Sequence, residues 1–168
     1  MDVFIEKIVA RNKTILDLLI VFGLLIGSLL VIYLFIAISV ITFLIPFAVI
    51  GLIYVDYLLI TKRNIEFEYI VTNGDLDIDM IISRKKRKRI FSANCKDFEF
   101  VASCSSDYYT PEIKKISKTL HAEGSMLSPS LYFILLNYKG IKTVVYFEPD
   151  ERILNSLKTY AHKKILIS

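Results

Sequence analysis

The pattern of hydrophobic and polar positions divides the chain into an apolar N-terminal third and an alternating remainder. No charged residue lies between Asp17 and Asp56, and this run is about twice the ~20 residues that a helix needs to cross a bilayer. Because a chain in lipid must satisfy its own backbone hydrogen bonds, the run predicts two helices folded back on each other. We place them at Thr14–Ala37 and Pro46–Thr61, with the turn near Ser39 and Thr42.

The alternating remainder begins with a β-hairpin. Ile65–Thr72 and Leu76–Ser83 flank Asn73-Gly74, a pair that favours a type I′ turn because both residues tolerate a positive φ. A two-residue turn sets the register, which places the apolar side chains of both strands on one face. The predicted pairs are Val71 with Leu76, Tyr69 with Ile78, Phe67 with Met80 and Ile65 with Ile82.

The rest of the chain predicts further strands and two more helices. Thr110-Pro111 begins a predicted internal helix that extends to Ala122, and Pro149-Asp150 begins a C-terminal helix. We therefore expect an α+β protein: a transmembrane helical hairpin, then a mainly antiparallel β domain that closes on a helix. The further predicted strands are Lys88–Ala93, Asp97–Ala102, Leu131–Asn137 and Lys142–Phe147.

The N-terminal residues predict a short amphipathic helix, with Phe4, Ile5, Ile8 and Val9 on one side. Such a segment can lie among the lipid headgroups. The predicted organisation is thus an amphipathic cytoplasmic segment at 1–13, a two-helix transmembrane hairpin at 14–61 and a cytoplasmic strand-rich domain at 64–168.

Positive charges beside the apolar run predict its orientation. Lys7, Arg11 and Lys13 precede the first helix and Lys62 and Arg63 follow the second, whereas the turn between them has no Lys or Arg. By the positive-inside rule both termini lie in the cytoplasm, as in a multi-pass protein of the cell membrane. The chain has 168 residues, 54% of them hydrophobic, which excludes a disordered protein, and the apolar run excludes a wholly soluble one.

A basic run follows the first hairpin and carries six cations, although the formal net charge of the whole chain is only +4. One interpretation is structural: the cations offset the carboxylates on the outer face of the hairpin, or keep an edge strand from pairing. The other is contact with anionic lipid headgroups. Nucleic acid is the least favoured partner, because no aromatic or motif context accompanies the charges. The run is Arg84, Lys85, Lys86, Arg87, Lys88 and Arg89, and the carboxylates are those of Glu66, Glu68, Asp77 and Asp79.

Small residues in the apolar helices are candidates for helix packing. Gly23 and Gly27 form a GxxxG pattern, which lets two helix backbones approach closely. The pattern could join two copies of the chain. We favour the alternative, in which it receives the second helix of its own hairpin near Ala48 and Gly51.

The two acidic residues at the edges of the apolar run are expected to form ion pairs. Asp17 and Asp56 lie toward the cytoplasmic ends of the predicted helices, where Lys13 or Lys62 can reach them. An ionisable group at mid-membrane would instead indicate a functional site.

The remaining polar residues predict no catalytic or metal site. Cys95 and Cys104 form no CxxC motif, and His121 and His162 stand apart from them. Both histidines lie near the ends of predicted helices, where a cation complements the helix dipole. We expect neither an enzyme nor a bound cofactor.

Several blocks of the sequence resemble a family of small two-span membrane proteins of Gram-positive anaerobes, catalogued as a domain of unknown function. These blocks are Met1–Arg11, Asn64–Met80, Arg87–Glu99 and Phe147–Arg152. More remotely, the architecture resembles bacterial pleckstrin-homology-like (PH-like) proteins, which implies a helix-capped barrel. We therefore expect a membrane-anchored binding module that contacts anionic lipid or an unidentified membrane or cytoplasmic protein. The alternative is a small accessory subunit of a larger membrane complex.

Overall fold

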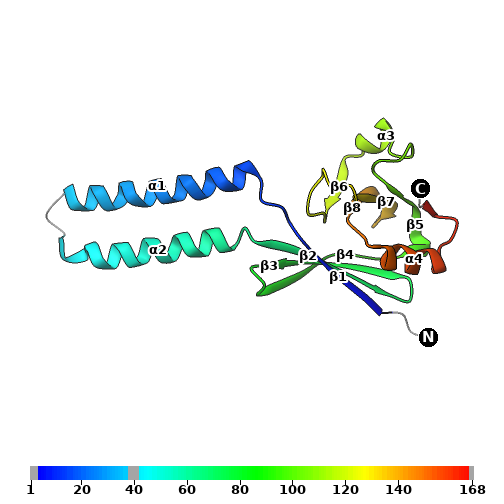
Figure 1. Cartoon of the computed structure of the whole chain (residues 1–168), viewed down its shortest axis with the longest axis horizontal. Coiled ribbons are helices and arrows are strands. Elements are labelled where there is room, and N and C mark those ends of the chain that lie inside the picture. The colour runs from blue at the N-terminus through cyan, green and yellow to red at the C-terminus, as the bar shows by residue number, and fades with distance from the viewer. Residues whose placement is uncertain (1–3, 38–41, 167–168) are drawn as a thin grey trace. The chain divides into compact units, whose positions relative to one another are not determined.

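The computed structural model describes residues 4–37 and 42–166 of the chain, so the predicted turn residue Ser39 lies outside the described residues. The chain divides into two compact units (Figure 1). One unit comprises residues 12–64, and the other comprises residues 1–11 together with residues 65–168. A short N-terminal segment and the long C-terminal part therefore fold as one body.

The first unit is a pair of apolar helices, α1 (Ile15–Ala37) and α2 (Ile45–Thr61), with a short 3-10 turn, η1 (Thr42–Leu44), before α2. The backbone N–H and the hydroxyl of Thr14 both donate to the Asp17 carboxylate, at 2.8 and 2.7 Å. A carboxylate in the first turn also complements the positive end of the helix dipole, which explains why α1 begins here.

By length, the two helices differ in their capacity to cross a membrane. Among the described residues, α1 is the one helix that is both long and apolar enough to span a bilayer. Helix α2 is also apolar but has 17 residues, fewer than the ~20 of a typical span. The expected pair of helices is present, but only one of them meets the length of a membrane span.

The first sheet contains four antiparallel strands in the order β1-β2-β3-β4. The predicted hairpin is confirmed pair by pair, from Val71 opposite Leu76 to Ile65 opposite Ile82. Its turn has positive φ at both Asn73 (49°) and Gly74 (90°), as a type I′ turn requires. The strands are β1 (Phe4–Ala10), β2 (Ile65–Thr72), β3 (Asp75–Ile82) and β4 (Lys86–Asn94).

The predicted N-terminal amphipathic helix is wrong, because the residues form β1. This strand pairs with β2 over its whole length, from Phe4 opposite Thr72 to Ala10 opposite Glu66. Burial alternates along β1, and Ile5 and Val9 pack against the core. Alternation with a period of two outweighs the helical pattern, since an available sheet edge lets these apolar side chains be buried.

The second sheet contains five strands in the order β6-β8-β7-β5-β9. The predicted helix from Pro111 to Ala122 is mostly wrong: it ends after one turn, α3 (Pro111–Lys114), and Lys118–His121 becomes strand β6. Burial alternates in β6, which pairs in parallel with β8. The remaining elements are η2 (Cys95–Asp97), β5 (Phe98–Ser103), β7 (Tyr132–Tyr138), β8 (Ile141–Phe147), α4 (Glu151–Tyr160) and β9 (Ile165–Leu166).

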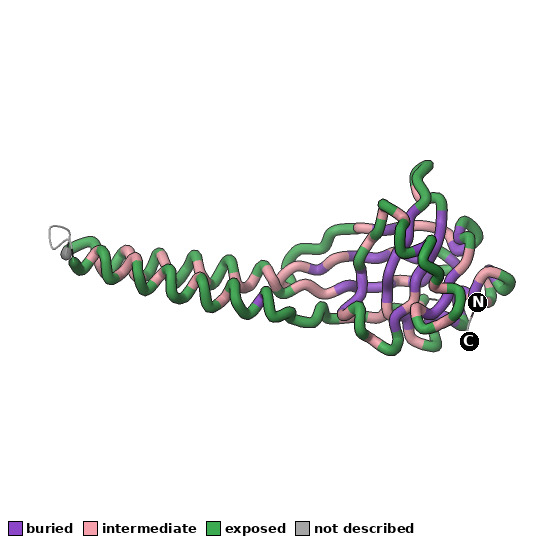
Figure 2. Tube along the Cα trace, turned by 90° about the horizontal axis from the view of Figure 1, so that it is seen from above, coloured by how far each residue is buried: buried purple, intermediate pink, exposed green. Residues whose placement is uncertain are grey.

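The main core lies between the apolar faces of the two sheets and helix α4. Tyr69 and Phe91 of the first sheet, Phe98 and Phe147 of the second, and Ile153 of α4 belong to one buried cluster. Figure 2 shows this burial concentrated in the strands, whereas the helix pair is largely exposed. In the described residues the strands form two open sheets, so the closed barrel implied by the remote resemblance is not present.

Candidate functional site

The basic run lies at the end of the first sheet where the chain leaves for the helix pair and returns from it. Ala10, the last residue of β1, pairs with Glu66. Ile65, the first residue of β2, pairs with Ile82, which in turn pairs with Lys86. The β3–β4 turn that carries the basic run is therefore at the same end of the sheet as both connections to residues 12–64.

The arginines of the run bind the acidic face of the sheet. Arg84 Nε lies 3.0 Å from Glu66 Oε1, and Arg87 Nη2 lies 2.9 Å from Glu68 Oε1. A single guanidinium, that of Arg89, pairs with two neighbouring carboxylates. These two carboxylates belong to Asp77 and Asp79. The structural interpretation of the run therefore holds for its three arginines.

The lysines of the run have a different environment. Lys86 lies opposite Ile82 and Lys88 opposite Met80, on the face of the sheet away from the carboxylates. Lys85 lies in the turn itself, and all three lysines are exposed. Within the described part of the chain, none of the three lysine side chains forms a hydrogen bond or ion pair. The run thus separates into paired arginines and accessible lysines.

Glu68 is the most buried member of the acidic face, with no exposed surface. Its oxygens lack a well-aligned hydrogen bond despite the nearby Arg87. Burial raises the pKa of Glu68, the nearby carboxyl of Glu6 raises it further, and the charge of Arg87 opposes this rise. The native sheet therefore holds a proton here at a pH at which an exposed glutamate would have lost it.

Replacing Glu68 by glutamine is expected to stabilise the protein increasingly as the pH rises. The unfolded chain loses this proton near the ordinary glutamate pKa of about 4.3, whereas native Glu68 keeps it to higher pH. The native state then binds more protons, so the free energy of unfolding of the wild type falls through this window. Denaturant unfolding of the full chain in micelles at about pH 4 and pH 8 measures the difference.

The matched control is Glu99→Gln, because Glu99 is an exposed carboxyl that pairs loosely with Lys142 at 3.5 Å. Exposed ion pairs contribute about 0–1 kcal/mol, so a small effect on the free energy of unfolding is expected. Equal pH dependence of the Glu68 and Glu99 variants would contradict the raised pKa.

A groove opens beside the unpaired edge of β4, with a volume of ≈ 700 Å³. Phe91 and Tyr138 lie along it, with their ring centroids 5.1 Å apart. Charged side chains of both signs, Arg89, Asp97 and Lys139, also line it. The groove combines the half-buried ring of Tyr138 with the edge strand of the first sheet, and a sheet edge can bind an extended peptide.

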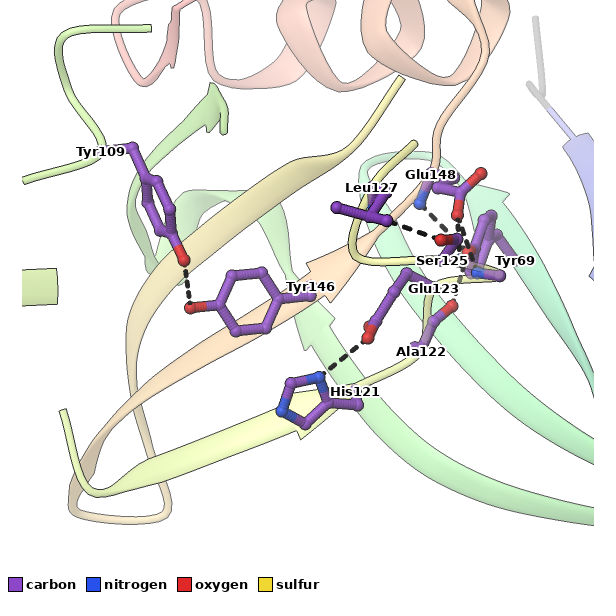
Figure 3. Close-up of polar contacts among 10 residues, drawn as sticks. Tyr69, Tyr109, His121, Ala122, Glu123, Ser125, Leu127, Tyr146 and Glu148 are labelled. Carbon is purple, nitrogen blue, oxygen red and sulfur yellow. Dashed lines mark hydrogen bonds and ion pairs between the residues drawn. The ribbon is translucent and has the colours of Figure 1, made fainter. Parts of the chain in front are cut away.

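A second polar cluster surrounds Tyr69 and Glu148 (Figure 3). The buried Tyr69 hydroxyl donates to the Ala122 carbonyl at 2.6 Å and accepts from the Glu148 backbone N–H at 3.1 Å. The Glu148 carboxylate accepts from the N–H groups of Gly124 and Ser125, at 2.8 and 2.9 Å. This cluster fixes the loop after β6 to the end of β8, so its evident role is structural.

His121 and Glu123 form a pair beside this cluster, with Nδ1 and Oε1 2.8 Å apart. The His121 ring stacks on Tyr146, whose hydroxyl lies 3.0 Å from that of Tyr109 (Figure 3). The nearby Cys104 is a poor nucleophile, since burial raises the pKa of its thiol to about 12. In the described residues no group of three or more His, Cys, Asp and Glu side chains could hold a metal ion.

The candidate packing glycines of the helices face open space. A Cβ atom added at Gly23, Gly27 or Gly51 would meet no atom within 4 Å, so these residues do not receive the other helix of the pair. Of the four candidate packing residues, the three glycines are exposed and Ala48 is half-buried. Close contact of Gly23 and Gly27 with another copy stays a prediction.

The expected ion pair is present at Asp17, although with a different partner, and in the described residues it is absent at Asp56. Asp17 pairs with Arg63, beyond the end of α2. Asp56 instead accepts a hydrogen bond of 2.6 Å from the hydroxyl of Ser28. Sequence position alone placed Asp56 near a helix end, but its partner lies close to the middle of α1. The serine in an otherwise apolar helix was the signal that could have indicated this contact.

These observations define a class of protein: a two-sheet α+β domain with a C-terminal helix, joined at one end of its first sheet to an apolar helix pair. The chain belongs to the family described as bacterial PH-like domain (DUF6106), whose model matches residues 1–167. The match includes β1 and the helix pair as well as the C-terminal domain. No curated protein and no solved structure matches the chain.

Proposed function

We propose that the protein is a non-catalytic binding module of the cell membrane. In this proposal α1 and α2 enter the bilayer together, and both termini lie in the cytoplasm. The PH-like domain then presents Lys85, Lys86 and Lys88 to anionic lipid headgroups.

The sheet pairing of β1 with β2 supports a helical hairpin in the membrane. These strands precede α1 and follow α2 in the chain, yet they are neighbours in one sheet. This pairing supports a topology in which both ends of the helix pair lie on one side of the membrane, with an even number of crossings. Helix α2 covers about 26 Å at 1.5 Å per residue, a shortfall that a bilayer accommodates by local thinning or by snorkelling of flanking residues such as Lys62.

The same pairing argues against a cleaved signal sequence. Removal of a signal peptide would also remove β1, and Ile5 and Val9 of this strand pack on the main core. The cations on both flanks of the helix pair favour the cytoplasmic side for the domain.

Chain length brings the basic run close to the bilayer. Three residues, 62–64, connect Thr61, the last residue of α2, to Ile65, and the four Cα-to-Cα steps span at most about 14 Å. Two strand spacings of about 4.8 Å then separate Ile65 from Lys86 across the sheet. Near an anionic leaflet each exposed lysine contributes about 1 kcal/mol to the free energy of membrane binding. The single observation that supports lipid contact is that three exposed lysines with unpaired side chains lie at the end of the sheet that connects to the helix pair.

The Lys85→Gln, Lys86→Gln, Lys88→Gln triple variant is expected to lose binding to anionic vesicles. A soluble protein for this test replaces residues 12–64 by a short Gly-rich turn, which retains β1. A fragment that begins at Asn64 would lack this strand. Wild-type protein should sediment with anionic vesicles and not with neutral ones, and the binding should weaken as salt screens the exposed charges. The triple variant should stay as stable as the wild type within about 0.5 kcal/mol.

A matched control changes three exposed lysines elsewhere, Lys114, Lys115 and Lys163, with the same loss of charge. This control should keep most of the vesicle binding. Wild-type protein that ignores anionic vesicles at low salt, or a control that loses as much binding as the triple variant, contradicts lipid contact by this lysine set.

The second candidate function is that of a small accessory subunit in a larger membrane complex. The observation that favours it is Asp56, an ionisable residue hydrogen-bonded within the helix pair rather than at its charged end. Ionisable residues inside membrane segments commonly mark sites of function or assembly.

A further inference from the structure

The hydrogen bond between Ser28 and Asp56 places a carboxylate deep in the helix pair. Ser28 lies close to the middle of the 23-residue helix α1, about 20 Å from the start of that helix at 1.5 Å per residue. Its hydroxyl is 2.6 Å from Asp56 Oδ2. If α1 spans the bilayer as proposed above, the Asp56 carboxylate lies near the centre of the hydrocarbon layer.

The helix pair supplies no positive charge to this carboxylate. The sequence from Thr14 to Thr61 contains no Lys or Arg. Arg63, which lies beyond the end of α2, is engaged by Asp17. Among the described residues Asp56 forms no ion pair, and the Ser28 hydroxyl is its only hydrogen-bond donor. Asp56 remains partly accessible on the surface of the pair.

A charged group in lipid is costly unless an opposite charge or a polar partner accompanies it, which is why such residues usually face a partner. A second copy of this chain cannot supply the missing cation, since its own helices bring another Asp56 and no Lys or Arg. A cation that pairs with Asp56 within the bilayer must therefore come from a different protein.

We propose that Asp56, oriented by Ser28, is a docking point in the membrane for a lysine or arginine carried by the transmembrane helix of a partner protein. This inference rests on the proposed insertion of the helix pair, and it specifies the chemistry of the partner in the accessory-subunit function. Ser28 is a positioning residue, because its hydroxyl donates to the Asp56 carboxylate, and Asp56 provides the charge.

The test uses the full chain in lipid vesicles with a synthetic polyleucine transmembrane peptide that has one central lysine. Energy transfer between labelled protein and labelled peptide measures their association. The lysine peptide should associate about tenfold more tightly than an all-leucine peptide, which corresponds to one interhelical polar contact. Asp56→Asn keeps an acceptor for Ser28 but removes the charge, and it should abolish this preference. Ser28→Ala should reduce it.

The outcomes separate the inference from the proposed function. Protease protection and labelling of the same vesicles report whether the helix pair is inserted. If the helix pair is not inserted in the bilayer, the result contradicts both the proposed function and this inference. An inserted pair that binds the two peptides equally, or an Asp56→Asn variant that retains the preference for lysine, contradicts the inference alone. Self-association of the protein that depends on Asp56 would identify a second copy as the partner and would also overturn it.

Discussion

Replacing Gly74 by alanine is expected to lower the free energy of unfolding by about 3 kcal/mol, the sum of a backbone and a packing cost. Gly74 has a φ of +90°, which costs an alanine roughly 1–2 kcal/mol. The added Cβ would also lie 2.9 Å from Cγ of Tyr160 and 3.2 Å from the sulfur of Cys95. Overpacking of this kind adds about 1–3 kcal/mol. Denaturant unfolding of the soluble protein with residues 12–64 replaced measures the change.

Gly140→Ala provides the matched control for the backbone cost. Gly140 has a similar φ of +81°, but a Cβ there would meet no atom within 4 Å. This variant should lose only the backbone part, about 1–2 kcal/mol. Equal losses at Gly74 and Gly140 would show that α4 does not pack on the β2–β3 turn.

Replacing Glu148 by alanine is expected to cost about 3 kcal/mol, because hydrogen bonds to a charged group contribute about 1.5–3 kcal/mol and their loss leaves unpaired donors. The donors are the N–H groups of Gly124 and Ser125 and the hydroxyl of Ser128. Because these three groups belong to one loop, the variant should loosen that loop before the sheets. Amide hydrogen exchange at Gly124 and Ser125 should accelerate most.

The control for this variant is Glu99→Ala, which removes an exposed carboxyl whose contact with Lys142 is long, at 3.5 Å. Exposed ion pairs contribute about 0–1 kcal/mol, so a small effect is expected. If exchange at Gly124 and Ser125 is unchanged in Glu148→Ala, the carboxylate does not hold the loop.

The β2–β3 hairpin could be predicted in full from the sequence, because local signals determine it. Asn73-Gly74 specifies the turn, and the alternation on both sides agrees with the register that this turn imposes. The start of α1 was also predictable, since Thr14 and Asp17 satisfy each other within one turn. In these two segments the local sequence signals and the hydrophobic pattern predict the same structure, and the tertiary contacts are consistent with it.

The N-terminal strand and β6 could not be predicted, because distant segments determine them. Residues 4–10 form a strand only because β2, more than fifty residues later in the chain, offers an edge. Likewise the helical spacing of Ile113, Ile116 and Leu120 is outweighed by the pairing of residues 118–121 with β8. Short segments follow tertiary context more readily than intrinsic propensity.

The location of the basic run could be predicted from the sequence, but the separation into paired arginines and accessible lysines was not predicted. The sequence identified the basic run and its acidic neighbours, and the pairing of Arg89 with Asp79 follows the expected third strand. Arg87 and Arg89 take carboxylates because they lie on the acidic face of β4, whereas Lys86 and Lys88 lie on its other face. The position of Asp56 could not be predicted, since it depends on how far α2 is displaced along α1.

A disulfide between β1 and β2 in native membranes tests the central claim, that both ends of the helix pair lie on one side in a single sheet. Glu6 and Ile70 are direct partners. The backbone hydrogen bond from Arg11 N–H to the Ile65 carbonyl marks residues 11 and 65 as a hydrogen-bonded pair. Because the two kinds of pair alternate along antiparallel strands, Glu6 and Ile70 form a non-hydrogen-bonded pair, with Cα atoms about 4.5 Å apart. This distance suits a disulfide. The background carries Cys104→Ala, and the remaining Cys95 is fully buried.

Glu6→Cys with Ile70→Cys should cross-link nearly completely in the full-length protein under mild oxidation. Glu6→Cys with Ser92→Cys should not, because three strand spacings of about 4.8 Å separate those positions. Mass analysis after thiol alkylation distinguishes the two. Efficient cross-linking of residues 6 and 70 alone is the result that our account predicts. Free thiols at both positions in membranes that contain the intact protein would contradict it.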